Sequence, residues 1–150
     1  ASLSVFRYQP AAMRLPEGSE LYGMLRLLGR FAQARAQGQG LHTADLHELE
    51  PVLVDDSLQR MLGTLCRIAL LRRAESGEWM LARDLGDVSM GELYEAAGLR
   101  LPVADMLLPC SDDAIGITAK AAIDALRLPL RERLQRSVAS IYALSEDHHA

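Results

Sequence analysis

Apolar residues recur at three- and four-residue spacing along most of the chain, which is typical of amphipathic helices. The first such run follows Ser19, a residue type that caps helices, and stops at Gly38 and Gly40. Its apolar positions are Leu21, Met24, Leu25, Leu28 and Phe31. The pattern predicts a first helix that begins at Ser19.

Two shorter helices are expected next. Thr43 is placed to cap an acidic helix that runs through Leu46 and Leu49 to Glu50, where Pro51 prevents continuation. Asp55 or Asp56 then caps a third helix with a single apolar stripe, formed by Leu58, Met61, Leu62, Leu65 and Ile68.

A β-hairpin and a fourth helix follow the third helix. Residues 70–75 and 78–82 flank Ser76 and Gly77, and a glycine-containing pair between two short runs marks a tight hairpin. The segment Ser89-Met90-Gly91-Glu92 is a capping box, and Gly98 suits the left-handed end of the helix it opens. Three helices, a hairpin and a further helix make up a winged-helix order, in which helices two and three form the helix-turn-helix and the hairpin is the wing.

The remaining residues predict an additional C-terminal helical pair. After an irregular connector at 101–109, Asp112 or Asp113 caps a helix through Ile115, Ala119, Ala122, Ile123 and Leu126. Pro129 suits the first turn of a final helix. That helix would carry Leu130, Leu134, Val138 and Ile141 on one side and Arg131, Arg133 and Arg136 on the other. We expect this pair to pack on the winged helix.

The predicted fold class is therefore mainly α. Residues 1–18 form a juxtamembrane linker and 19–98 a winged-helix domain; residues 99–144 form the connector and helical pair, and 145–150 a frayed tail. Composition agrees, because aromatic residues are only 5% of the chain and the apolar content is mainly Leu and Ala, which favour helices.

The linker carries a membrane signal although the chain has no run of 18 apolar residues. Phe6 and Tyr8 lie beside Arg7 and Arg14, and no acidic residue precedes Glu17. Aromatic and basic residues mark the cytoplasmic exit of a transmembrane helix. The alternative is an unstructured N-terminus with two chance arginines.

Charge argues against the usual role of a winged helix, which is DNA binding. Between residues 40 and 90 there are nine acidic side chains and five arginines. Each phosphate contact needs a cation to displace a condensed counterion, so an acidic reading head disfavours nucleic acid. The residues that could still form a local nucleic-acid-binding patch are Arg60, Arg67, Arg72 and Arg73.

No pattern indicates catalysis, a metal or a cofactor. His42 and His47 are five residues apart, a spacing that does not stack two ligands on one helix face. Cys66 and Cys110 are far apart in sequence and are expected to be reduced thiols. The paired aspartates precede helices, where capping explains them.

The C-terminal region is basic, with Lys120 and four arginines between residues 120 and 136 against two acidic residues. Such a face is either simply solvated or contacts an acidic membrane surface. The expected partners are thus an unknown protein or the acidic inner-leaflet surface. Oligomeric state cannot be read from the pattern, since the apolar stripe of the first helix suits a dimer as well as a core.

Three segments resemble a known family. They are ASLSVFRYQP at 1–10, LYGMLRLL at 21–28 and WMLARD at 79–84. The first is similar to the exit from the last transmembrane helix of YihY/BrkB-family bacterial inner-membrane proteins, long labelled ribonuclease BN, and the others resemble the cytoplasmic extension of some members. The resemblance covers essentially the whole chain.

The resemblance implies a bacterial inner-membrane parent with this domain on the cytoplasmic side, and it transfers no catalytic residue. We therefore expect a non-catalytic interaction or regulatory domain. Two alternatives remain: a ribonuclease involved in tRNA processing, which rests on the family label alone, and a membrane-anchored DNA-binding regulator, which requires the four arginines to cluster.

Overall fold

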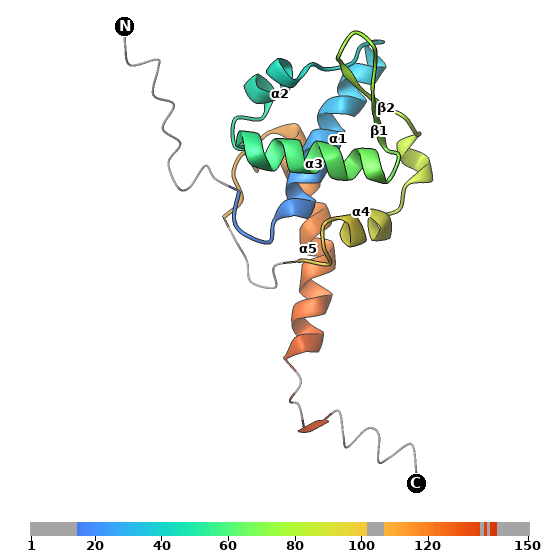
Figure 1. Cartoon of the computed structure of the whole chain (residues 1–150). Helices are drawn as coiled ribbons and strands as arrows, with labels where there is room; N and C mark the ends of the chain where they lie inside the picture. The colour runs from blue at the N-terminus through green and yellow to red at the C-terminus, as the bar shows by residue number, and fades with distance from the viewer. Residues whose placement is uncertain (1–14, 102–106, 136, 138, 141–150) are drawn as a thin grey trace, which may run out of the picture.

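The computed structural model describes residues 15–101, 107–135, 137 and 139–140. Within these residues the protein is mainly helical, with one small antiparallel sheet (Figure 1). The elements in chain order are α1 (Glu20–Ala36), α2 (Thr43–Leu49), α3 (Asp55–Arg67), β1 (Leu71–Arg73), β2 (Trp79–Leu81), the 3-10 turn η3 (Leu85–Asp87), α4 (Met90–Ala96) and α5 (Ala114–Leu134).

Helix α1 forms the centre of the core and contacts α3, α4, α5 and β2. The apolar stripe predicted for α3 is confirmed, because Leu58, Met61, Leu62 and Leu65 are all fully buried. Ile68 lies just beyond the end of α3 and is half-buried. The residues of this α3 stripe lie at the three- and four-residue spacing that directs side chains to one face of a helix.

The groups that cap the helices differ from those predicted. Ser19 does occupy the N-cap of α1, but its hydroxyl is buried and has no hydrogen-bond partner among the described residues. Its backbone instead closes a turn, with the Ser19 N–H bonded to the carbonyl of Pro16 and Gly18 at a φ of +82°. The prediction of a Ser19 cap is right in position and wrong in chemistry.

The cap of α2 was predicted one residue too late, and that of α3, given to Asp55 or Asp56, one or two residues too late. His42 precedes α2, and its N–H donates to Asp45 at 2.9 Å, while the Thr43 hydroxyl accepts from the Trp79 indole at 3.2 Å. Val54 precedes α3, so Asp55 lies inside the first turn of the helix, where the helix dipole still favours a carboxylate.

The hairpin is confirmed, with Leu71 opposite Leu81 and Arg73 opposite Trp79. Its loop is longer than the Ser76-Gly77 pair. Gly77 donates to the carbonyl of Ala74 and has a φ of +93°, which gives a three-residue loop ending in a left-handed glycine.

A backbone bridge that the sequence pattern did not reveal ties the hairpin to the α1–α2 connection. Leu41 and Trp79 exchange both backbone hydrogen bonds, at 2.9 and 2.7 Å. A Cβ on Gly40 would lie 2.8 Å from the Trp79 carbonyl oxygen, so this close approach requires glycine.

Half of the predicted capping box is present at α4. The Ser89 hydroxyl accepts from the Glu92 N–H at 3.1 Å, whereas the Glu92 carboxylate contacts Arg83 at 3.5 Å. Gly98 ends the helix with a φ of +83°, as expected of a left-handed C-cap.

The predicted C-terminal helical pair is wrong. A single helix, α5, runs from Ala114 to Leu134 with Pro129 inside it, and only the cap by Asp113 is as predicted. Proline has a φ that suits a helix interior as well as a first turn, and here the loss of one N–H bond does not break the helix. The linker up to residue 14, most of the 101–109 connector, Val138, Ile141 and the tail at 145–150 lie outside the described residues.

Candidate interaction surface

Helix α5 is fixed to α1 through Arg26, which is 1% exposed. Its guanidinium donates to both carboxylate oxygens of Glu50, at 2.5 and 3.0 Å, and to both of Asp113, at 3.0 and 2.7 Å. A further bond, of 2.9 Å, reaches the Cys110 carbonyl. Bidentate arginine–carboxylate pairs fix position and angle together, so Arg26 joins α1, the end of α2 and the start of α5 at one point.

Two neighbouring side chains complete this network. Arg30, one turn after Arg26, donates to Glu50 at 2.8 Å, so the fully buried Glu50 carboxylate accepts from two arginines. The Tyr22 hydroxyl, one turn before Arg26, donates to the Pro109 carbonyl at 2.7 Å. The two arginines and the two carboxylates, Glu50 and Asp113, balance in charge, so the buried Arg26 and Glu50 each have oppositely charged partners.

The pKa shifts follow from these contacts. Hydrogen bonds from Arg26, with a smaller contribution from the Gly116 N–H, lower the pKa of Asp113 to about 2. Burial alone would lower the pKa of Arg26, but its bonds to Asp113 and Glu50 outweigh burial and raise it. Both groups are therefore held in their charged forms.

Glycines allow α5 to approach closely. A Cβ on Gly116 would lie 2.0 Å from the Cys110 carbonyl oxygen, and one on Gly29 of α1 would lie 3.0 Å from Ile115. No larger residue fits at position 116 without displacing the turn that precedes α5.

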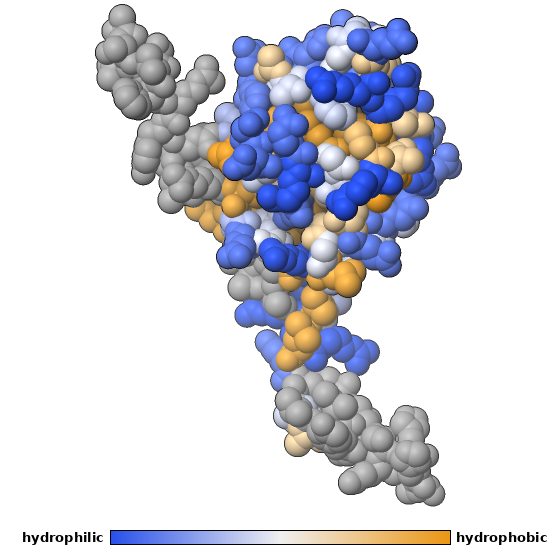
Figure 2. Space-filling view, in the orientation of Figure 1, coloured by the Kyte–Doolittle hydropathy of each residue, from blue (hydrophilic) through white to orange (hydrophobic). Residues whose placement is uncertain are grey.

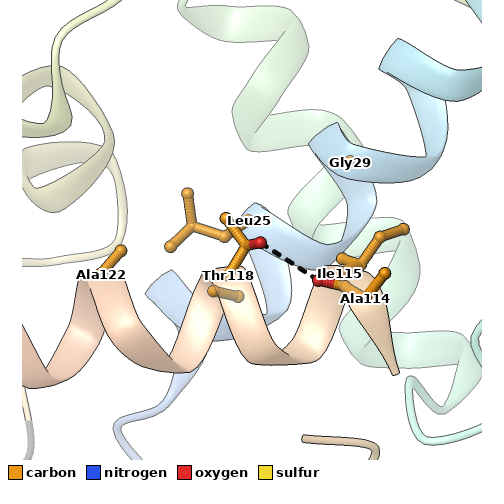
Figure 3. A pocket seen from close by; sticks show the side chains of 7 residues that line it. Leu25, Gly29, Ala114, Ile115, Thr118 and Ala122 are labelled. Carbon is orange, nitrogen blue, oxygen red and sulfur yellow. Dashed lines mark hydrogen bonds between the residues drawn. The ribbon is translucent and has the colours of Figure 1, made fainter. Parts of the chain in front are cut away.

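An apolar groove of about 260 Å³ lies beside this contact, between α1 and the first half of α5 (Figure 3). Its walls are Leu25, Gly29, Ala114, Ile115, Thr118, Ala119 and Ala122. The Thr118 hydroxyl is turned back to the Ala114 carbonyl at 3.1 Å, so even the polar side chain of the groove is locally satisfied. The surface of the groove that remains exposed is therefore apolar.

The last turns of α5 extend beyond the rest of the fold (Figure 1). We call residues 128–134 the projecting end and residues 114–127 the docked part. Leu128 and Leu134 are 52% and 61% exposed, and Arg131, Glu132 and Arg133 are exposed with them. Figure 2 shows apolar surface running along the projecting end with polar surface beside it. On the docked part, Ile117 is also 59% exposed and faces away from α1.

Sequence reasoning missed Arg26, the residue that fixes this surface. A signal was present: between Leu21 and Phe31, Arg26 and Arg30 are the only charged residues, and they lie one turn apart. A helix that is apolar nearly all round is a buried helix, so its few charged residues need buried partners.

The four arginines named for nucleic-acid binding lie on two elements and have different surroundings. Arg60 pairs with Glu20 at 2.8 Å, and Arg67 donates to Thr64 in the last turn of α3. Arg72 and Arg73 are consecutive on β1 and so point to opposite faces of the hairpin, with Arg73 over the Trp79 ring at 5.1 Å.

No group of three or more metal-binding side chains occurs within the described ranges. Cys66 and Cys110 are free thiols, as expected, and burial raises the pKa of each. None of the helices in the part of the chain that the structure describes is long and apolar enough to cross a membrane.

Comparison with known proteins gives a consistent set of relatives. The chain is 56% identical over 147 residues to a UPF0761 membrane protein of Stenotrophomonas maltophilia, which covers 98% of this chain and 35% of the relative. A UPF0761 membrane protein of Xanthomonas campestris is 55% identical over 142 residues, covering 95% of this chain and 33% of the relative. No family model matches the chain. No solved structure matches it either.

The chain spans about a third of the length of the curated relatives it matches. Their names carry no activity and describe membrane proteins, which supports membrane association and fits the YihY/BrkB-type resemblance. The chain is thus similar, along nearly its whole length, to part of the uncharacterised UPF0761 membrane proteins.

Proposed function

We propose that the chain is a non-catalytic winged-helix interaction domain on the cytoplasmic side of a bacterial inner-membrane protein. The observation that carries the proposal is α5, which a buried ion network holds rigidly while leaving an apolar groove and several large apolar side chains exposed. Exposed apolar surface on an otherwise well-packed domain marks a site of interaction.

The winged-helix assignment is supported by the Leu41–Trp79 bridge. Helices α1 to α3 precede the β1–β2 hairpin, and the bridge adds a one-residue third strand between α1 and α2. The hairpin is thereby attached to the helices at both ends, as a wing must be if it is to hold a fixed angle to α3.

A protein or membrane partner is favoured over DNA. On α3, the Arg60 charge is already paired with Glu20, and Asp55 and Asp56 occupy the first turn of the helix that would enter the major groove. Carboxylates in that position repel the phosphate backbone. The DNA-binding regulator therefore remains the second candidate.

Placement at the inner membrane, on the cytoplasmic side, is supported by Arg7 and Arg14 in a segment without acidic residues, since basic residues are retained in the cytoplasm. The relatives' additional length and their names as membrane proteins are consistent with a membrane-spanning parent.

Two measurements test the proposal. A reporter that is active only in the cytoplasm, fused after Ala150 in the full-length parent, should be active, and activity of a periplasmic reporter at the same place would refute the location. Duplex DNA titrated at low salt should show no saturable, salt-sensitive binding. Tight binding that is lost in Arg67→Glu with Arg72→Glu would instead establish the regulator.

A further inference from the structure

We propose that the projecting end of α5 inserts into the headgroup layer of an anionic phospholipid bilayer. The inference rests on the proposed function only in that a membrane parent brings a bilayer within reach. It adds a specific surface, residues 128–134, and a specific ligand chemistry.

The side chains of the projecting end are arranged for an interface. Leu128 lies on one side of the helix and Leu130 and Leu134 lie on the opposite side, so apolar side chains occur on two sides of the projecting end. Arg131 and Arg133 lie between these leucines. Arginine can extend its apolar stem along a membrane-inserted helix and leave its guanidinium among lipid phosphates.

The direction of α5 places this tip at one particular end of the molecule. Along α5, Ile115 lies against Gly29 of α1, and the later residues Ala119 and Ala122 share the groove with Leu25. The two helices are therefore antiparallel, and α5 passes the start of α1 before it projects (Figure 1).

Charge favours an anionic surface as the ligand. Within α5, Lys120 and Arg127 pair with Asp124. The excess of basic charge on the helix therefore comes from Arg131 and Arg133 of the projecting end, which outnumber Glu132. Basic side chains beside exposed leucines complement an anionic headgroup layer.

A second copy of the chain suits this surface less well. Two projecting ends packed against each other would bring two pairs of exposed arginines together with only one glutamate from each helix. Like charges at such short range oppose association, whereas lipid phosphates neutralise them.

The test is co-sedimentation of the full chain with vesicles. Binding to phosphatidylcholine vesicles that contain phosphatidylglycerol should be clear, binding to pure phosphatidylcholine much weaker, and raising the salt from about 0.05 to about 0.5 M should release the protein. Arg131→Glu with Arg133→Glu should weaken binding at least about tenfold. Leu130→Gln with Leu134→Gln should have a similar effect, because it removes apolar area from the tip.

Matched variants on other exposed surfaces control for net charge and hydrophobicity. Arg67→Glu with Arg72→Glu makes the same charge change on α3 and β1, and Leu49→Gln with Val54→Gln the same kind of apolar change near α2. Both controls should bind vesicles as the parent chain does, and circular dichroism checks that every variant is folded.

Three results would overturn the proposal. They are absence of binding to anionic vesicles, binding that the α5 variants leave unchanged, and a dimer that Leu130→Gln with Leu134→Gln dissolves while vesicles bind nothing. None of these affects the reporter or DNA measurements, so failure of the membrane contact is distinguishable from failure of the proposed function.

Discussion

The two parts of α5 share one spacing of apolar positions but differ in their surroundings. In the docked part, Gly116, Ala119 and Ile123 face α1 and are buried. In the projecting end, Leu130 and Leu134 continue the same apolar stripe, yet Leu134 is largely exposed because α5 has passed the start of α1. The difference shows that the apolar pattern of a helix predicts which of its faces turns toward the core. How much of that face is buried depends on how far the neighbouring helix extends along it.

The ends of α5 also differ in how they are held. At the start of the helix, the buried Arg26 pairs with the partly exposed Asp113, and Gly116 allows contact with the preceding turn. At the other end, residues 131–135 are all exposed. We therefore expect substitutions in the docked part to change the global free energy of unfolding and those in the projecting end to leave it nearly unchanged.

The largest effect is expected for Arg26→Leu. The variant leaves the buried Glu50 carboxylate with Arg30 alone and removes both bonds to Asp113, so it should lower the free energy of unfolding by about 3 kcal/mol or more. Urea denaturation followed by circular dichroism measures the loss. Arg131→Leu in the projecting end should change stability by less than about 0.5 kcal/mol. Equal losses in the two variants would contradict the comparison.

Gly116→Ala should cost about 1–3 kcal/mol, because the added methyl overlaps the Cys110 carbonyl and the turn must shift. The matched control is Gly63→Ala, at an exposed position of α3 where nothing lies within 4 Å of the new Cβ. That change should raise stability by about 0.5–1 kcal/mol through helix propensity. A neutral Gly116→Ala would mean that the turn before α5 is not packed as described.

Acid should loosen the docked part through Asp113. Its pKa is about 2 in the folded protein, below the ordinary value near 4, so its contribution to stability is present above about pH 4 and is lost as the pH falls toward 2. Asp113→Asn should flatten the dependence of the unfolding free energy on pH in that window.

A double variant tests the cause of this pH dependence. In the Arg26→Leu background, Asp113→Asn should produce little further flattening, since the pKa shift comes first from Arg26. Undiminished flattening in that background would assign the pH dependence to the Gly116 N–H or to Arg30 instead.

Much of the framework followed from the sequence, because periodic apolar residues and turn glycines act locally. The stripe of α3, the hairpin around Gly77 and the end of α4 at Gly98 were all predicted. The cap predicted at Thr43 was misplaced by one residue, since the Thr43 hydroxyl accepts a hydrogen bond from Trp79, a partner 36 residues away. Local patterns cannot report a competing contact of that kind.

The parts that could not be predicted depend on contacts between distant residues. Arg26 contacts Glu50 and Asp113, which are 24 and 87 residues away in sequence. The Leu41–Trp79 bridge likewise joins segments that share no local pattern. Pro129 was taken as the start of a new helix, although the local geometry of proline suits a first turn and a helix interior equally. In the structure Pro129 lies in the interior, because α5 continues through it.

The smallest effect on global stability is expected for Pro129→Ala. Proline in a helix interior is about 3 kcal/mol less favourable than alanine, partly because it leaves the carbonyl four residues earlier without its bond. In the projecting end this cost falls on a segment that can open without unfolding the core. Pro129→Ala should therefore slow hydrogen exchange of the amides at 130–134 while the global free energy of unfolding changes by less than about 0.5 kcal/mol. A large gain in global stability would show that the projecting end is coupled to the core, and the two parts of α5 would then have to be treated as one cooperative unit.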